Sequence, residues 1–446
     1  MMLRSLVKQR AREIGFDLVG ISPVDAYDGL KFSREWVKRG FGGEMRYLEN
    51  PKRDDPRLVL PSAKSVICVS LIYNAPLPYS VEVDKTGSRE SGVGSREKNG
   101  IESSGHQAIE PLKEKESSNG SMVRSLNGTV LLDDGPRGWI SRYAWGTDYH
   151  KVMRSKLEQL RRAVEALAPG VETRGYVDTG PVVERAFARL SGIGWAGKNT
   201  CLINEAKGSW FFLGVMLTSL ALDPDLPAPD RCGTCTACIE ACPTQALVEP
   251  YVMDASRCIA YFNIELKGAI PEEFRPAIGS NVVGCDICQD VCPWNGKGRS
   301  QESEVRSQNE EGGRSVATTS QAEFQPMKVN VERGFAHAES LTPNPEPLTF
   351  SLFNPPLEAL ASLNENDFRR IFQKSPIKRV KYRGWLRNLC VAMGNSGDSK
   401  FLPRLRYFRE HSDPIVREHA KWAILQILKT KSLAAEIHPQ RVPCPS

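Results

Sequence analysis

Residues 232–243 read CGTCTACIEACP and residues 285–293 read CDICQDVCP, and these two runs decide how the chain is organised. The first has the spacing C-x2-C-x2-C-x3-C-P, which holds iron–sulfur clusters: three neighbouring thiolates wrap one cluster and the fourth crosses to a second. The second run has one Cys fewer, and Cys258 between the runs makes up the deficit. The eight thiolates are enough for two four-iron clusters.

The spacing assigns the thiolates to clusters and argues against other uses. One cluster takes Cys232, Cys235, Cys238 and Cys292, and the other takes Cys242, Cys258, Cys285 and Cys288. Zinc sites generally use well-separated C-x2-C pairs, and disulfides need an oxidising compartment. The remaining cysteines are predicted to be buried or incidental thiols: Cys68, Cys201, Cys390 and Cys444. We therefore expect a bacterial ferredoxin-like domain at residues 231–297 with two [4Fe-4S] clusters.

Composition bounds the class of protein. A chain of 446 residues suggests roughly two to four domains. The first 15 residues form a charged amphipathic segment without a signal-peptide core, and no apolar run approaches a membrane span. We therefore expect a cytoplasmic protein whose thiols stay reduced. Residues 351–446 carry 17 Lys and Arg against 8 Asp and Glu, which predicts a polyanionic partner for that part.

Helical and strand patterns alternate over residues 1–230, which indicates an α/β or α+β domain. Strands are expected at 16–21, 65–73, 175–177 and 210–220, and helices at 6–15, 149–167 and 181–190. Residues 84–134 and 298–346 are rich in Ser, Gly, Glu and Lys and are predicted to be disordered insertions. Residues 347–446 are predicted to form a basic, HEAT-like helical domain, because 383–394 and 414–428 resemble each other.

Two short motifs leave alternatives open. Gly192–Asn199 fits G-x-G-x-x-G, but a helix precedes it and strands follow, so a nucleotide P-loop is rejected, although such a loop lets backbone amides approach a large cofactor. Asp178 follows a strand and is either the cap of a helix starting at Pro181 or a positioned acid in a cleft. Asp148 is expected to be a helix N-cap, and His150 a helix-face residue rather than a metal ligand.

Residues 369–387 contain eight basic residues and no acid, with Phe372, Tyr382 and Trp385 interleaved. This pattern is typical either of a solvated helical face whose aromatic residues lie in the core or of a groove that follows phosphates.

In combination, VDTGPVVERAFARLSGIGWAGKN at 177–199, the two Cys runs and the HEAT-like end resemble the epoxyqueuosine reductases. Reductive dehalogenases share the cobalamin and cluster parts of that pattern but not the C-terminal repeats. The resemblance implies a nitroreductase-like domain at 1–230 that binds cobalamin base-off. The absence of a D-x-H-x-x-G motif, which supplies a His ligand in many cobalamin proteins, agrees with this.

The resemblance also implies roles for residues. Asp178 is expected to touch the cofactor and to donate a proton from a desolvated pocket. The other cobalamin contacts are expected at Arg53, Ser141, Lys198 and Asn199, and tRNA contacts at Lys267, Lys378, Arg379, Lys381 and Arg383. The implied reaction reduces epoxyqueuosine to queuosine in tRNA and releases the epoxide oxygen as water. Electrons are expected to come from a soluble donor through two clusters to cobalamin, in a monomer.

Two other functions fit parts of the sequence. A cobalamin and iron–sulfur reductase of a small molecule would not depend on the basic C-terminal repeats. A ferredoxin-like electron carrier would bind clusters but no cobalamin.

Overall fold

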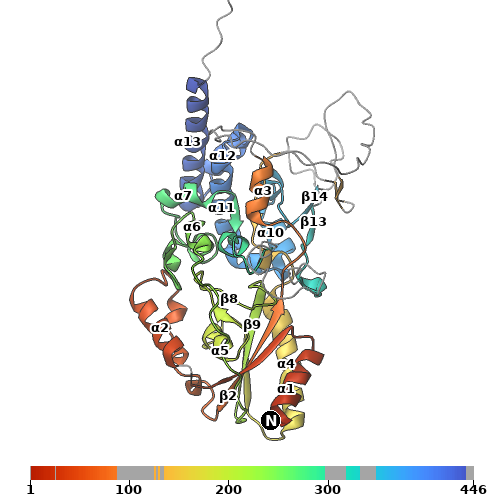
Figure 1. The fold of residues 1–446 in the computed structure, drawn as a ribbon. Helices are drawn as coiled ribbons and strands as arrows, with labels where there is room; N and C mark the ends of the chain where they lie inside the picture. The colour runs from red at the N-terminus through yellow and green to blue at the C-terminus, as the bar shows by residue number, and fades with distance from the viewer. Residues whose placement is uncertain are drawn as a thin grey trace, which may run out of the picture.

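The computed structural model describes residues 2–25, 27–87, 135–296, 318–331 and 348–437, together with the short strands β3 (Ser125–Leu126) and β4 (Thr129–Val130). The insertion predicted at 84–134 therefore lies largely outside the described residues. Figure 1 shows an elongated molecule with a sheet at one end, the C-terminal helices at the other and the Cys-rich segments between them.

A four-stranded antiparallel sheet forms the first end, in the order β1–β2–β9–β6. Its strands are β1 (Leu18–Pro23), β2 (Ser65–Ile72), β9 (Phe211–Thr218) and β6 (Thr173–Tyr176). Every residue of β2 is buried, as expected of a continuous apolar strand covered on both faces. The four predicted strands are thereby confirmed, with ends displaced by a few residues.

Helices cover both faces of the sheet (Figure 1). On one face lie α1 (Met2–Glu13) and α4 (Tyr149–Leu167). The buried Leu157 and Leu160 of α4 pack with strand residues in one core. On the other face lies α5 (Glu184–Leu190), through Phe187 and Ala188. The helix predicted at 149–167 is confirmed at both ends. The helix predicted from Pro181 begins instead at Glu184.

Short elements fill the middle of the molecule. Near the Cys runs lie α6 (Ala237–Glu240) and α8 (Ile287–Asp290), which pack against each other, and a hairpin of β10 (Leu247–Glu249) and β11 (Val252–Met253). The remaining elements of this part are α2 (Tyr27–Lys38), α3 (Ser80–Gly87), β5 (Trp139–Ile140), β7 (Trp195–Ala196), β8 (Leu202–Ile203), α7 (Arg275–Ile278) and β12 (Asn281–Val283). The parallel pair β5–β12 joins the N-terminal half to the cluster segment.

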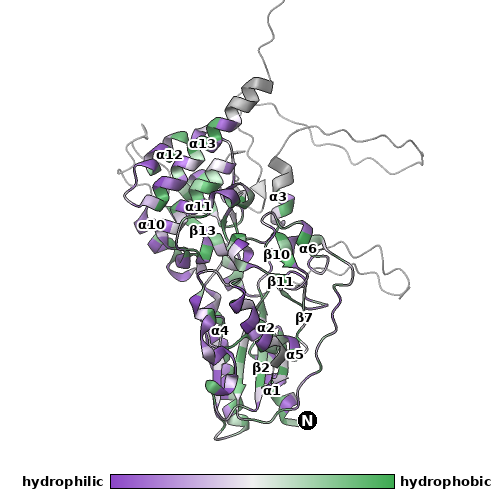
Figure 2. Ribbon diagram, turned by 90° about the vertical axis from the view of Figure 1, so that its left-hand side faces the viewer, coloured by the Kyte–Doolittle hydropathy of each residue, from purple (hydrophilic) through white to green (hydrophobic). Residues whose placement is uncertain are grey.

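The C-terminal part is helical from Leu357 onward, as predicted, but the prediction is wrong at its start, where Leu348–Ser351 form the strand β14. It contains α9 (Leu357–Ala361), α10 (Glu365–Ile371), α11 (Lys381–Asn395), α12 (Leu402–Arg409) and α13 (Pro414–Ile437). Figure 2 shows both hydrophobic and hydrophilic residues along the C-terminal helices. The second half of α11 is apolar and buried, and Gly394 lets it approach α13 so closely that a Cβ there would lie 2.9 Å from Ala423. Among the described residues, no helix is both long and apolar enough to cross a membrane.

The disorder predicted for 298–346 is wrong for residues 318–331. There β13 (Lys328–Val331) pairs antiparallel with β14 (Leu348–Ser351), and Phe324 is 2% exposed in the core beside the sheet. The alternation in KVNV places two valines on one face, and both are buried. The composition averaged over the long polar flanks concealed this local pattern, and the flanks at 297–317 and 332–347 lie outside the described residues.

Arg387 is a buried connector between α11 and the cluster segment. It is 2% exposed, and its guanidinium donates to the carbonyl oxygens of Phe262, Leu266 and Gly268. The basic stretch 369–387 is thus neither wholly a solvated face nor wholly a groove for phosphates.

We expect Arg387→Ala to lower the free energy of unfolding by about 3 kcal/mol or more, because one buried and two partly buried carbonyl oxygens lose their donor. Urea unfolding of the anaerobic protein, followed by circular dichroism, measures this. Arg409→Ala is the control, since that exposed side chain pairs only with Glu410 at the surface and should cost less than about 1 kcal/mol. Equal losses in the two variants would show that the connector adds no stability.

Candidate functional site

Asp178 occupies a strained turn between β6 and α5. Its φ is +55°, and the N–H of Thr179 donates to the carbonyl oxygen of Val177 over 2.6 Å, which makes Asp178 the centre of a γ-turn. This geometry is uncommon for a residue with a side chain and costs about 1–3 kcal/mol. Asp178 does not cap α5, because the cap position is Val183 without a side-chain hydrogen bond. The capping alternative is therefore excluded.

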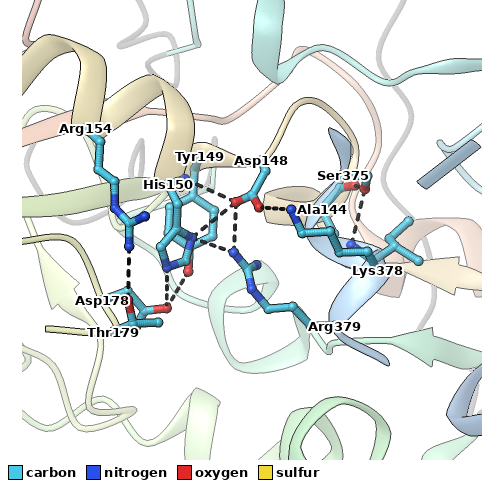
Figure 3. Close-up of polar contacts among 11 residues, drawn as sticks. Ala144, Asp148, Tyr149, His150, Arg154, Asp178, Thr179, Ser375, Lys378 and Arg379 are labelled. Carbon is cyan, nitrogen blue, oxygen red and sulfur yellow. Dashed lines mark hydrogen bonds and ion pairs between the residues drawn. The ribbon is translucent and has the colours of Figure 1, made fainter. Parts of the chain in front are cut away.

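Two side chains from the first turn of α4 meet the Asp178 carboxylate (Figure 3). The Tyr149 hydroxyl donates to Oδ2 over 2.6 Å, and His150 Nε2 lies 3.5 Å from the same oxygen. The Asp178 side chain is 61% exposed, so the desolvated pocket expected from the sequence is wrong for the protein alone. Burial raises the pKa of Tyr149 well above its usual value, and the negative charge of Asp178 raises it further. The hydroxyl therefore stays protonated and can donate.

Asp148 joins this pair to the C-terminal part. It caps α4, as predicted, and is 3% exposed. Its carboxylate accepts from Arg379 Nη2 over 2.8 Å and lies 3.0 Å from Lys378 Nζ. Burial alone would raise the pKa of Asp148, but its contacts with His150, Lys378 and Arg379 hold that pKa well below the usual range. The carboxylate therefore stays ionised and holds both cations.

Other carboxyl groups surround Asp178. Burial raises the pKa of Glu184 to about 8, and the Asp178 charge adds to the rise. Glu184 Oε1 is enclosed without a hydrogen-bond partner among the described residues. Burial also raises the pKa of Glu265, while the Lys267 charge lowers it and the Asp178 charge raises it. With its raised pKa, Glu184 adds little negative charge to the site at neutral pH.

Of the residues expected to contact cobalamin besides Asp178, only Arg53 lies at this turn, where Nη1 donates to the Gly180 carbonyl oxygen over 2.9 Å. Ser141 is buried and donates to Asp286. Lys198 Nζ donates to the carbonyl oxygens of Gly233 and Cys235, and Asn199 Nδ2 to that of Cys288. These three side chains therefore hold the Cys runs against the sheet domain.

Electrostatic interactions between thiols group the eight predicted ligands into two neighbourhoods, which Cys201 links. Burial raises the pKa of the Cys292 thiol to about 12, and the charges of Cys201, Cys238 and Cys232 add to the rise. Burial likewise raises the pKa of Cys238, with Cys232 and Cys235 contributing. Burial raises the pKa of Cys285 well above its usual value, with Cys258 and Cys242 contributing.

The second neighbourhood also contains Cys288, which lies near Cys285 and Cys258. Cys201, predicted to be incidental, is also there, and a hydrogen bond with Cys288 lowers the pKa of its thiol. Nothing in the sequence indicated this contact, since Cys201 lies 87 positions away from Cys288.

The five residues expected to contact tRNA differ in availability. Lys267, Lys381 and Arg383 are exposed, and Arg383 Nη2 donates to the Lys267 carbonyl oxygen over 2.8 Å. Lys378 and Arg379 are instead bound to Asp148. Sequence reasoning missed Tyr149 and His150 as partners of Asp178. The signal available was Asp-Tyr-His directly at a helix start, which gathers polar and aromatic groups at one helix end.

Comparisons with known proteins agree with one another. Residues 231–295 match the family model described as 4Fe-4S double cluster binding domain, and residues 125–179 match Epoxyqueuosine reductase QueG, DUF1730. The epoxyqueuosine reductase of Gloeobacter violaceus is 38% identical over 88% of this chain and 96% of its own length. That of Xanthomonas campestris pv. campestris is 34% identical over 94% of this chain and 95% of its own length.

Solved structures show the same likeness. An epoxyqueuosine reductase bound to an epoxyqueuosine-modified tRNA-Tyr stem loop is 27% identical, with a TM-score of 0.68 over 99% of this chain and 95% of that one. The enzyme from Bacillus subtilis, with an aspartate-bearing catalytic loop swung out of the active site, is 26% identical, with a TM-score of 0.66 over 98% and 95% of the two chains.

We expect Glu184→Gln to remove a pH dependence of stability. With a pKa of about 8 in the folded protein and 4.5 ordinarily, Glu184 keeps a proton that the unfolded chain releases between those values. Stability therefore falls as pH rises through that window, by at most about 1.4 kcal/mol per pH unit from one group. Melting temperatures at pH 5.5 and 7.5 should differ less in the variant; the same difference in both proteins would contradict the assignment.

Proposed function

The chain belongs to the epoxyqueuosine reductases, and we propose that its reaction takes place at the Asp178 turn. The enzyme is an oxidoreductase that converts epoxyqueuosine to queuosine, a reduction that takes two electrons and two protons and releases the oxygen as water. The observation that carries the proposal is the exposed carboxyl group of Asp178. It stands on a strained backbone turn and accepts a hydrogen bond from the Tyr149 hydroxyl at one of its two oxygens. The Bacillus subtilis relative, with its aspartate-bearing catalytic loop, supports it.

Asp178 is proposed as the proton donor to the departing oxygen. Because Tyr149 and His150 both face Oδ2, the acidic proton belongs on Oδ1, the oxygen left for the substrate. As that proton leaves, negative charge grows on the carboxylate, and the Tyr149 hydroxyl stabilises it. The exposure of Asp178 in the protein alone gives a bulky nucleoside access, and the substrate itself would exclude water there.

The thiol neighbourhoods fit two [4Fe-4S] clusters. Each cluster takes four thiolates, and the electrostatic interactions among the predicted ligands of each neighbourhood support the assignment made from the spacing. Cys235 is exposed, so the first cluster is proposed as the entry point for electrons from a soluble donor. When bound, the clusters supply single electrons toward the substrate.

Cobalamin fits the described residues only in part. Arg53 lies at the Asp178 turn, but Ser141, Lys198 and Asn199 are engaged with the Cys runs. We therefore propose that these three side chains hold the Cys runs beside the sheet. A nitroreductase-like, base-off cobalamin domain at 1–230 and a HEAT-like pair at 347–446 remain proposals that the family supports.

A tRNA is the proposed carrier of the substrate, because a solved relative binds an epoxyqueuosine-modified stem loop. The exposed Lys267, Lys381 and Arg383 are proposed to meet its backbone phosphates. A cytoplasmic monomer is consistent with these features. The two alternatives, a small-molecule reductase and an electron carrier, are not favoured, since the likeness extends over the C-terminal helices as well.

We expect Asp178→Ala to lower turnover by about 100-fold or more, the usual contribution of a positioned acid, while both clusters remain. Single-turnover conversion of an epoxyqueuosine-modified stem loop, by anaerobic enzyme given a chemical reductant, measures this. Asp223→Ala, an exposed carboxylate outside the site, is the control. Full turnover by Asp178→Ala would refute the assignment.

Cys258→Ala should lower bound iron from about eight to about four per chain, because one cluster loses a thiolate. Cys201→Ala is the matched control: its thiol contacts Cys288, yet it is not a proposed ligand, and iron should stay near eight. Iron and sulfide analysis of the two anaerobically purified variants measures this difference. Loss of iron only from the Cys201 variant would reverse the ligand assignment.

A further inference from the structure

Arg379 makes a contact that neither tRNA binding nor the proton donor explains. It lies in the 3-10 turn Pro376–Val380, just before α11, and its Nη2 is 2.6 Å from His150 Nδ1 and 2.8 Å from Asp148 Oδ1. Its guanidinium also lies over the Tyr149 ring, 5.5 Å from the centroid. One nitrogen thus bridges a carboxylate and an imidazole that both belong to the start of α4 (Figure 3).

This bridge determines where the proton of His150 lies. A guanidinium nitrogen carries hydrogens and cannot accept, so at 2.6 Å the imidazole Nδ1 must be the acceptor. Asp148 Oδ1 is also 3.2 Å from Nδ1, a separation that would suit an Nδ1–H donor. The two readings exclude each other, because an Nδ1–H would oppose the shorter contact with Arg379. The neutral ring therefore carries its proton on Nε2.

The proton on Nε2 faces Asp178. His150 is 5% exposed, and Nε2 is enclosed without a hydrogen-bond partner among the described residues. Asp178 Oδ2 lies 3.5 Å away, slightly beyond a hydrogen bond. A small movement of the Asp178 turn closes that gap. In the other tautomer, Nε2 would present a lone pair to Oδ2 and repel the carboxylate that forms when Asp178 releases its proton.

We propose that Arg379 is a positioning residue for the reaction: it fixes the His150 tautomer so that Nε2–H stabilises the Asp178 carboxylate. The inference rests on the proposed role of Asp178. Because Arg379 is carried by the C-terminal helical part, the proton-donor site is complete only when that part is docked against α4. The charged and titratable groups around His150 are Asp148, Tyr149, Asp178, Lys378 and Arg379.

The test is a double-mutant cycle between Arg379→Ala and His150→Gln in the full-length enzyme with modified stem loop. A Gln side chain offers an amide N–H near the Nε2 position and has no tautomer to set. Arg379→Ala should lower kcat about tenfold with His at position 150, a share of the usual acid–base contribution. With Gln there, the same change should alter kcat by less than about twofold.

Lys378→Ala provides the comparison, since Lys378 binds the same Asp148 carboxylate without touching His150. Whatever its effect on kcat, that effect should be the same with His or Gln. If the double variant does not fold, as judged by iron content and circular dichroism, rescue replaces it. Added guanidinium ion should then restore kcat to Arg379→Ala, whereas ammonium ion should not.

Three results would overturn the proposal. They are an equal loss of kcat in both backgrounds, a rise in KM with kcat unchanged, and rescue by ammonium as effective as by guanidinium. The second would return Arg379 to a tRNA-binding role. All measurements keep Asp178, so a failure of the proton-donor assignment is recognised separately, by turnover in Asp178→Ala.

Discussion

The buried carboxylate of Asp148 is the constraint on which the site depends. It starts α4 by accepting the His150 N–H, and it binds Lys378 and Arg379 from a segment more than 200 residues later. A charge this buried is tolerated only when it is paired and hydrogen-bonded. Losing either the cap or the cations would leave the carboxylate uncompensated. The pairing of Asp148 with Lys378 and Arg379 therefore favours one position of the C-terminal part relative to the start of α4.

That placement is supported by a continuous core. Trp139 and Trp145, which precede α4, pack in the same apolar cluster as Phe262 of the cluster segment and Leu389 of α11. Arg387 adds hydrogen bonds across the same junction. The Asp178 turn lies on the sheet side, and Lys378 and Arg379, which bind Asp148 beside it, come from the helical side. One packed junction thus connects the Asp178 side of the molecule to the helices that carry the surface proposed for RNA.

The sequence predicted the regular parts of this arrangement because their signals are local. The apolar run of β2, the periodicity of α4 and the Cys spacing each report their own neighbourhood. It failed where partners are distant. Nothing near Arg379 indicates that it binds Asp148, and nothing near Ser141 indicates that it donates to Asp286. Composition failed too at 318–331, where a short alternating strand pairs with β14.

The engagement of basic side chains also changes how the charge of the C-terminal part is understood. Arg387 binds three backbone carbonyl oxygens, Arg275 is paired with Glu418, and Lys378 and Arg379 are held by Asp148. A cation held by a buried carboxylate cannot release counterions from a phosphate without breaking that pair. The electrostatic attraction for RNA must then come from the exposed cations, such as Lys381, so the formal basic excess overstates the phosphate contacts this part can make.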